Sequence, residues 1–207
     1  RVRFLDNQAS SSDAALDLYA TGQNPRARLT NLLFAGNRLD SMGDSDKLVH
    51  VDNYATDLNL SLAHVTAADN RVPTFLYVET GGTDHSATVA LSNTLLVSFT
   101  NAFVGDQGGT GDVVIQHTHT LTEQVENLHV ALEGYPTFVA ANPVSGDAEL
   151  DGSYHLRPSS DAIDAGVDAG VTIDIDGDSR VEYAPPDIGA DEFTTYRVLL
   201  PLVKRSE

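Results

Sequence analysis

The feature that most constrains the fold is a short pattern that returns at long intervals. In each copy an aliphatic residue is followed by any residue and then by Asn or His, and the copies are Leu29-Thr30-Asn31, Leu62-Ala63-His64, Leu91-Ser92-Asn93 and Ile115-Gln116-His117. Their first residues are 33, 29 and 24 positions apart. Gly-, Asn- and Asp-rich turns precede the first copy at 21–25 and separate the copies at 42–46, 79–84 and 105–111. Periods of this length are typical of solenoids. We therefore expect an all-β solenoid whose coils turn at these sites.

The clearest strand lies between Thr88 and Thr100, where apolar and polar residues alternate. Asn93 falls on the apolar face of this strand, where a buried amide needs hydrogen-bond partners. Stacked coils supply such partners. The pattern therefore predicts one polar column running from coil to coil, made of Asn31, His64, Asn93 and His117.

His117 also has a functional interpretation. His117 and His119 would share a face at strand spacing and could bind a metal ion, but no third ligand is evident, so a hydrogen-bonded polar stack is the stronger reading.

Residues 122–133 fit two patterns. Val125, Leu128 and Leu132 could form a helix face that is closed by Gly134, whereas Leu128, Val130 and Leu132 alternate as in a strand. Both readings stay open from the sequence.

The last third of the chain carries a series of spaced motifs. They are Tyr135-Pro136-Thr137-Phe138-Val139, Tyr154-His155-Leu156-Arg157-Pro158-Ser159, Ala162-Ile163-Asp164-Ala165-Gly166, Asp174-Ile175-Asp176-Gly177-Asp178-Ser179-Arg180 and Asp187-Ile188-Gly189-Ala190-Asp191-Glu192-Phe193. In this order the series resembles the closing segment of secreted bacterial right-handed parallel β-helix proteins with a choice-of-anchor Q domain. The resemblance implies a right-handed parallel β-helix and an extracellular or cell-surface location. Family members commonly have Asp where Tyr135 stands and Pro where Ser160 stands, so the turns there are expected to differ.

These patterns divide the chain into three parts. Residues 1–134 are expected to form the β-helix coils, 135–193 to close the end of the helix, and 194–207 to form a terminal tail. Residues 1–20 look like the middle of a coil without a polar cap, with Phe4, Leu5, Leu16 and Tyr19 available for packing. We therefore expect upstream coils or another copy of the chain to cover the N-terminal face.

The charge narrows the classes of partner. Thirty acidic and twelve basic residues give a formal net charge of -18, which repels nucleic acid and favours divalent cations or uncharged glycans. The longest apolar run, 198–203, is too short to span a membrane and contains a proline. The chain has no cysteine, so its stability must come from packing and backbone pairing.

One candidate cation site stands out. Asp174, Asp176 and Asp178 alternate around Gly177 and could bind calcium, although the glycine position and Pro185 rule out an EF-hand loop. The alternative is a turn whose aspartates cap backbone amides, with Arg180 paired to Asp187 or Glu192.

No catalytic residues can be assigned from the sequence. There is no nucleophile elbow and no phosphate-binding loop, and thirty carboxylates have no diagnostic value. The leading hypothesis is an extracellular structural or adhesive module that interacts with glycans, in which a row of exposed aromatic residues would support glycan binding. One alternative is a polysaccharide lyase or glycoside hydrolase, which a clustered acid and base would support. The other is a self-assembling filament subunit.

Overall fold

The computed structural model describes residues 1–10, 13–40, 46–180 and 184–194. These residues form strands and turns without a helix, so they include no helical segment able to cross a membrane. The strands are β1 (Val2–Leu5), β2 (Gln8–Ala9), β3 (Asp13–Gly22), β4 (Arg26–Ala35), β5 (Arg38–Leu39), β6 (Lys47–Ala55), β7 (Asp57–Ala68), β8 (Thr74–Thr80), β9 (Ser86–Gln107), β10 (Val113–Ala131), β11 (Thr137–Ala141) and β12 (Val144–Ser145). The loop predicted at 42–46 and the tail predicted at 194–207 lie almost wholly outside the described residues.

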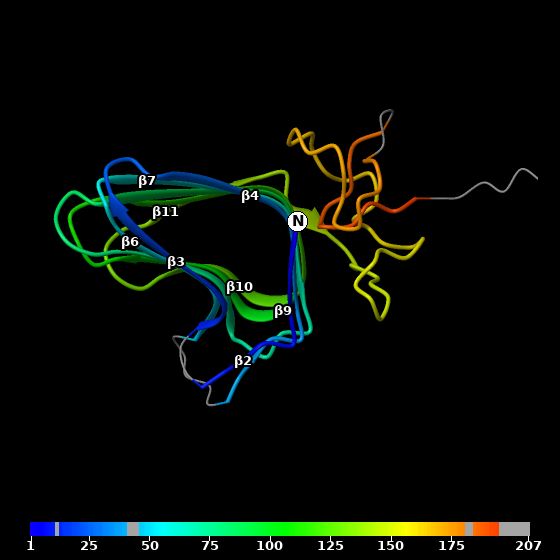
Figure 1. Cartoon of the computed structure of the whole chain (residues 1–207), viewed down its shortest axis with the longest axis horizontal. Helices are drawn as coiled ribbons and strands as arrows, with labels where there is room; N and C mark the ends of the chain where they lie inside the picture. Colours follow the sequence, from blue (N-terminus) through cyan, green and yellow to red (C-terminus); the bar gives the residue numbers. More distant parts are fainter. Residues whose placement is uncertain (11–12, 41–45, 181–183, 195–207) are drawn as a thin grey trace, which may run out of the picture.

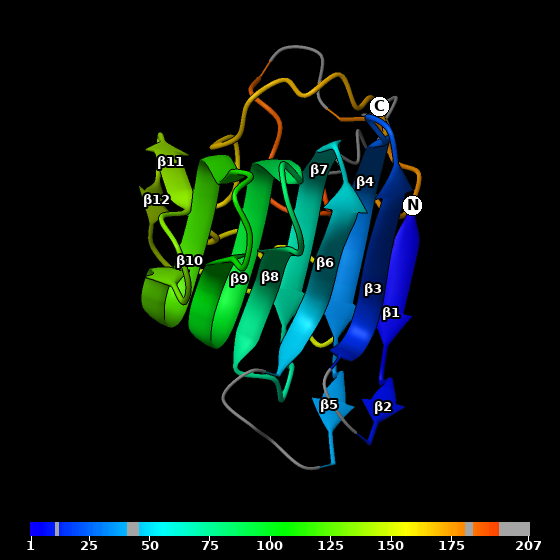
Figure 2. The same ribbon diagram turned by 90° about the vertical axis from the view of Figure 1, so that its left-hand side faces the viewer.

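The strands stack as a parallel β-solenoid of about five turns, which confirms the predicted fold class (Figures 1 and 2). The first coil consists of β1, β2 and β3, the second of β4, β5 and β6, and the third of β7 and β8. The long strands β9 and β10 each form a coil alone, and β11 and β12 continue the stack beyond β10. Residues 122–133 are therefore mostly strand, as one of their two sequence patterns predicted.

Each coil bends where one residue adopts a left-handed backbone conformation. At the first bend these residues are Asn31, His64, Asn93 and His119, with φ between 49° and 56°. The parallel register aligns them, because Thr30 pairs with Ala63, Ala63 with Ser92 and Ser92 with Thr118. Asn and His are among the few residues that tolerate this conformation, which explains why they recur here.

The predicted polar column is correct for three of its members and wrong for the fourth. His117 pairs in register with Leu91, so the offset between β9 and β10 is 26 residues, and the last copy of the pattern begins at His117 instead of Ile115. His119 therefore takes the column position, while His117 points into the core and is 2% exposed.

A second polar column, the asparagine ladder, connects the first three coils and is buried in the second and third. The Nδ2 of Asn7 donates to the Oδ1 of Asn37 at 2.7 Å, and the Nδ2 of Asn37 donates to the Oδ1 of Asn70 at 2.8 Å. Each asparagine follows a left-handed bend residue at the second bend, namely Asp6, Gly36 and Asp69. This ladder is the hydrogen-bonded stack expected for a solenoid, at a different place from the one predicted.

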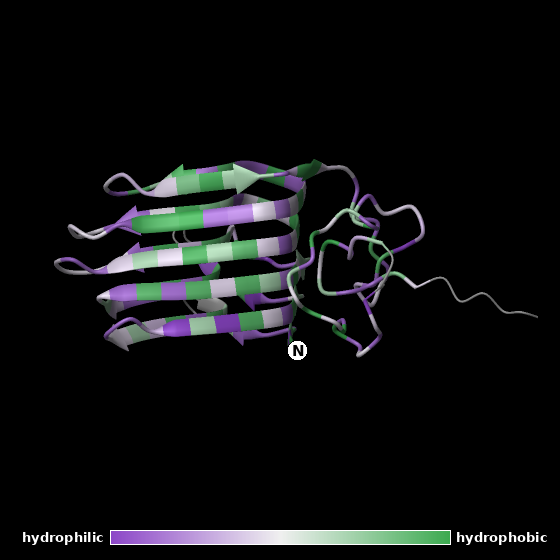
Figure 3. Cartoon of the chain, turned by 90° about the horizontal axis from the view of Figure 1, so that it is seen from above, coloured by the Kyte–Doolittle hydropathy of each residue, from purple (hydrophilic) through white to green (hydrophobic). Residues whose placement is uncertain are grey.

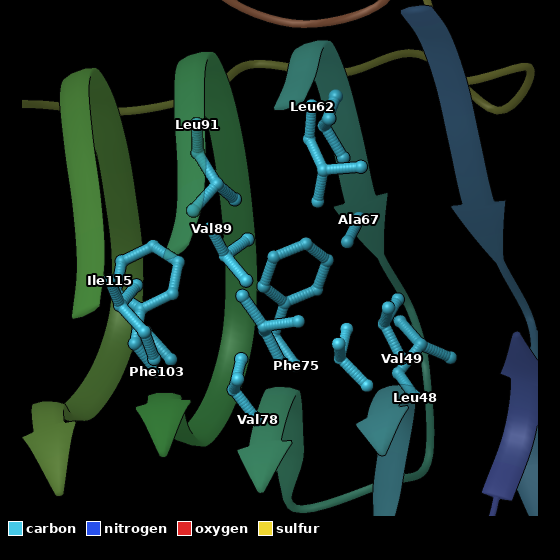
Figure 4. Packing of buried hydrophobic residues seen from close by; sticks show 14 of the residues in the cluster. Leu48, Val49, Leu62, Ala67, Phe75, Val78, Val89, Leu91, Phe103 and Ile115 are labelled. Carbon is cyan, nitrogen blue, oxygen red and sulfur yellow. The ribbon is translucent and has the colours of Figure 1, made fainter. Parts of the chain in front are cut away.

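The core between the sheets is apolar and includes a stack of aromatic rings (Figure 4). The ring of Phe4 lies 4.7 Å from that of Phe34 between centroids, and Phe75 and Phe103 continue the series into the third and fourth coils. In the fifth coil His129 pairs in register with Phe103, and the ring of His117, which pairs with Leu91, lies 4.7 Å from that of Phe103 between centroids. Two imidazole rings therefore continue the aromatic series in the fifth coil.

Residues 146–180 and 184–193, here called the lateral segment, lie along the side of the stack and not across its end (Figures 1 and 3). The solenoid itself continues to Ser145, beyond the boundary at 134 that the sequence suggested. The side chains of the first bend hold the lateral segment through its backbone: Asn31 Nδ2 donates to the carbonyl of Ile173 (2.7 Å), His64 Nδ1 lies 3.2 Å from the carbonyl of Gly189, and Asn93 Nδ2 donates to the carbonyl of Val167 (2.7 Å). The residues of the first bend thus both turn the coils and bind the lateral segment.

A buried ion pair fixes the interior of the lateral segment. Nη1 of Arg180 donates to Oε2 of Glu192 at 2.8 Å, and their side chains are 3% and 0% exposed. Nη2 of Arg180 also donates to Oδ1 of Asn31 at 3.0 Å, which links the pair to the second coil. Of the two partners that the sequence offered for Arg180, the structure selects Glu192.

The N-terminal end of the stack has open strand edges. Among the described residues, β1 and β3 are the outermost strands of the main sheet, and the first half of β4 pairs only with β7. Leu5 and Tyr19 at this end are 45% and 65% exposed. A hollow of about 460 Å³ opens beside Tyr19, lined by residues that include Leu18, Leu58 and Leu60.

Candidate functional site

The most distinctive exposed surface is a face of the solenoid formed by β3, β6, β8 and the second half of β9. These strands lie side by side in Figure 2. Val51 and Val78 point inward and are fully buried, so the residues that follow them point outward. The register places Tyr19, Asp52, Glu79 and Asp106 in one row across the four strands. Together with Tyr54 they form what we call the aromatic–carboxylate face.

Two tyrosines from neighbouring coils form its aromatic part. The ring centroids of Tyr19 and Tyr54 are 5.5 Å apart, and the two side chains are 65% and 46% exposed. Tyr54 also makes an edge contact with His85, with 6.4 Å between centroids. The rings therefore remain available to solvent on a rigid sheet.

Gly81 sets the position of Tyr54. A Cβ atom at Gly81 would lie 2.7 Å from Cε1 of Tyr54, which is closer than two carbon atoms can approach without displacement. Only glycine lets the ring lie against the backbone at this point.

Beside the rings lies a groove of about 240 Å³. It is lined by Asp52, Tyr54, Glu79, Thr80, Gly81, Asp106, Gly108 and Glu133. Partial burial and the neighbouring charge of Glu79 raise the pKa of Asp52. Oδ1 of Asp52 is buried and has no hydrogen-bond partner among the described residues. The negative charge of Asp52 in turn raises the pKa of Tyr54.

Neighbouring residues fix the rest of this row. The hydroxyl of Tyr77 donates to Oδ2 of Asp106 at 2.5 Å, and Nζ of Lys47 lies 4.4 Å from the centre of the Tyr77 ring. His50 lies 3.2 Å from Glu79 and 3.3 Å from Asp17 through its two ring nitrogens. Asp106 and Glu79 are therefore held in place, while Asp52 faces the groove.

The sequence predicts this row of carboxylates through a second periodicity, which is independent of the aliphatic-x-Asn/His repeat. An acidic residue recurs every 27 positions at Asp52, Glu79, Asp106 and Glu133. The offsets between β6 and β8 and between β8 and β9 are also 27, since Val49 pairs with Leu76 and Leu76 with Phe103. A search for charged residues at the coil period would have found the row.

The structure does not bring the predicted calcium ligands together. Oδ1 of Asp174 accepts the backbone N–H groups of Asp176, Gly177 and Asp178 at 2.8 to 2.9 Å, and its Oδ2 accepts that of Glu192 at 3.2 Å. Asp174 is thus the cap of a turn, as the alternative interpretation held. Asp176 turns away to Arg3 and His155, and Asp178 is exposed.

The pair His117 and His119 likewise does not form a metal site. The left-handed bend at His119 directs the two side chains apart, because strand alternation stops there. His117 instead meets His129, with their Nε2 atoms 2.8 Å apart, and its Nδ1 lies 3.0 Å from Oγ1 of Thr120. Burial, together with His129, lowers the pKa of His117 to about 4, so the imidazole is neutral near pH 7.

Comparison of the chain with protein-family models, with curated proteins and with solved structures finds no match. The choice-of-anchor Q resemblance therefore remains a prediction from the closing motifs, and the function must be argued from the geometry of this chain.

Proposed function

We propose that the chain is an extracellular adhesive or structural β-solenoid module that binds uncharged or amine-bearing glycans along the aromatic–carboxylate face. The observation that carries this proposal is the exposed pair Tyr19 and Tyr54 beside a row of carboxylates. Aromatic rings stack on the C–H faces of sugars, and carboxylates accept hydrogen bonds from hydroxyl and ammonium groups. The net charge of -18 disfavours anionic polysaccharides.

The spacing of the face suits a repeating ligand. Successive strands of a solenoid are separated by about 4.8 Å, so the tyrosines and carboxylates form a linear series of contacts across the coils. The groove beside Tyr54 is lined by carboxylates from successive strands, namely Asp52, Glu79 and Asp106. An extended chain of sugar residues can use several such contacts at once, which raises its overall affinity.

Calorimetric titration with soluble chito-, cello- and galacturonic acid oligosaccharides tests the proposed specificity. We expect binding of the first or second class and none of the acidic one. Replacing Tyr19 or Tyr54 with Ala should weaken binding by about tenfold, because each removes a stacked ring, whereas the Phe variants should retain it. Val139→Ala is the matched control, since Val139 lies on β11 and is 45% exposed, like Tyr54. Equal affinity of the Ala variants and wild type would refute glycan binding at this face.

The carboxylate row also supports a second candidate function, a glycoside hydrolase. Glycoside hydrolysis uses a pair of carboxyl groups, one of them acting as the acid. The row brings the carboxyl groups of Asp52, Glu79 and Asp106 onto neighbouring strands, and partial burial raises the pKa of Asp52. If this is the function, wild type should release reducing ends from a bound oligosaccharide and Asp52→Asn should not. Stable binding of the oligosaccharide without release of reducing ends would contradict the hydrolase and support the adhesive function.

For the N-terminal end of the stack, we propose that a further β-coil pairs with β1, β3 and the first half of β4. The open edges support such a partner, as does the hollow beside Tyr19, which is lined in part by leucines. Light scattering across a range of concentrations tests this proposal. We expect the isolated 207 residues to associate as concentration rises, and a monodisperse monomer at high concentration would contradict it.

A further inference from the structure

The lateral segment brings together three side chains that no part of the proposed glycan face uses. His155, Asp176 and Asp191 each offer one ligand atom, and these atoms all lie within 4.8 Å of one another. Nε2 of His155 is 2.8 Å from Oδ2 of Asp176. Among the described residues this is the group of histidine and carboxylate side chains whose geometry fits a metal ion.

The backbone of the lateral segment holds each ligand in place. The turn capped by Asp174 fixes the direction of Asp176. Asp151 accepts the backbone N–H of His155 at 3.0 Å, and Asp191 accepts that of Leu156 at 2.8 Å through Oδ2. The three ligands therefore come from three turns that are already ordered by other bonds.

Asp191 is the most telling member. It is 7% exposed, and the hydrogen bond to its side chain from the described residues goes to Oδ2, which leaves Oδ1 without one. One oxygen of Asp191 lies within 4.8 Å of the ligand atoms of His155 and Asp176. Because Leu156 bonds to Oδ2, Oδ1 remains available to a cation.

The surroundings of the cluster are acidic. Nδ1 of His155 lies 3.7 Å from Oδ1 of Asp151, which is too far for a hydrogen bond but places a further negative charge beside the imidazole. Arg3 of β1 binds Oδ1 of Asp176, which leaves Oδ2 for the cation. A bound ion would thus connect the lateral segment to the first coil through Asp176 and Arg3.

We infer that His155, Asp176 and Asp191 form a binding site for a divalent transition-metal ion of the zinc type. One imidazole nitrogen and two carboxylate oxygens are ligands that zinc accepts at tetrahedral geometry, with a fourth position for water. Calcium and magnesium prefer six or more oxygen ligands, which this cluster does not provide. The bound ion stabilises the lateral segment on the solenoid by mass action.

Titration calorimetry with zinc chloride on the full chain, after dialysis against a chelator, tests this site. The expected result is one zinc ion per chain, with affinity reduced at least about tenfold in His155→Ala and in Asp191→Asn. Zinc should also raise the melting temperature of wild type but not of His155→Ala. The His155 side chain is 39% exposed, so its variant remains informative if Asp191→Asn fails to fold.

Two matched controls separate this site from others. Asp178→Asn removes an exposed carboxylate of the neighbouring turn, and His119→Gln removes a histidine outside the cluster, so both should bind zinc like wild type. Loss of binding in Asp178→Asn alone would overturn the inference in favour of the three-aspartate turn. Absence of stoichiometric binding in wild type, or unchanged affinity in His155→Ala, would also overturn it.

Discussion

Nδ2 of Asn93 lies 3.0 Å from Nε2 of His64, so two neighbouring coils meet through their bend side chains. The same Asn93 amide exchanges two hydrogen bonds with the backbone of Val167, at 2.7 and 2.8 Å. Burial, together with the nearby charge of Arg180, lowers the pKa of His64 to about 3, so its ring stays neutral and can accept from Asn93. Coil stacking and docking of the lateral segment therefore depend on the same few side chains.

Asn93→Leu should lower the free energy of unfolding by about 2 to 4 kcal/mol. The substitution leaves the N–H and C=O of Val167 without partners and forces leucine into the left-handed conformation. His119→Leu is the control. His119 has the same left-handed backbone conformation as Asn93 but, among the described residues, makes no hydrogen bond to the lateral segment, so its replacement should lower the free energy of unfolding by only about 1 to 2 kcal/mol. Equal losses in denaturant titrations would show that the Asn93 bonds contribute nothing.

Arg180→Ala should destabilise the protein by about 3 to 5 kcal/mol, since it removes the guanidinium that pairs with the buried carboxylate of Glu192. The lateral segment should also become more sensitive to limited proteolysis, because Arg180 links it to Asn31. Arg157→Ala, which removes an exposed arginine of the same segment, is the matched control and should behave like wild type. A melting temperature of Arg180→Ala equal to that of Arg157→Ala would contradict the role of the ion pair.

His117 should make the fold sensitive to acid. Its pKa is about 4 in the folded chain and 6.5 when unperturbed, so the unfolded state binds the proton first. Its contribution to stability is complete above pH 6.5 and is lost as the pH falls toward 4, by an amount on the order of 3 kcal/mol.

The difference in stability between wild type and His117→Phe isolates this effect. Phenylalanine fits the aromatic stack next to Phe103 but does not titrate. The difference cancels groups that do not contact His117, and it includes the coupled neighbour His129. Asp187 is one group that cancels: burial raises its pKa to about 7, so its contribution is complete below pH 3.8 and is lost as the pH rises toward 7. Wild type should lose stability relative to His117→Phe between pH 6.5 and 4, and a constant difference across this range would be the contrary result.

Gly81→Ala should weaken glycan binding as much as Tyr54→Ala while leaving the melting temperature nearly unchanged. The added methyl group would occupy the place of the Tyr54 ring and push it from the face. Gly152→Ala is the control, since a Cβ there meets no atom within 4 Å. If the same calorimetric titration gives wild-type affinity for Gly81→Ala, the position of the Tyr54 ring does not matter for glycan binding.

The solenoid could be predicted because its determinants are local. Alternation around Thr88–Thr100 and recurring Asn and His residues report strands and bends directly. The register of the last coil could not be read in the same way, because His117 stands where earlier coils have leucine and the aliphatic pattern therefore points to Ile115, two residues early. The structure resolves this because backbone pairing, and not residue type, sets the offset.

The lateral segment shows the limit of pattern analysis. Its motifs were visible, but its place beside the stack depends on bonds between residues far apart in sequence, such as Asn93 with Val167 and Asn31 with Arg180. The three aspartates also look alike in sequence, whereas Asp174 is enclosed by backbone N–H groups and Asp176 meets His155. Which carboxylate faces a cation is decided by the turn that surrounds it.

The central claim, that the aromatic–carboxylate face binds glycans, is tested most directly by nuclear magnetic resonance of the backbone amides during titration with a chito-oligosaccharide. We predict chemical-shift changes confined to β3, β6, β8 and the second half of β9, with the largest changes near Tyr54 and Glu79. Changes centred on the lateral segment or on β11, or no changes at all with chito-, cello- and other uncharged oligosaccharides, would contradict the claim.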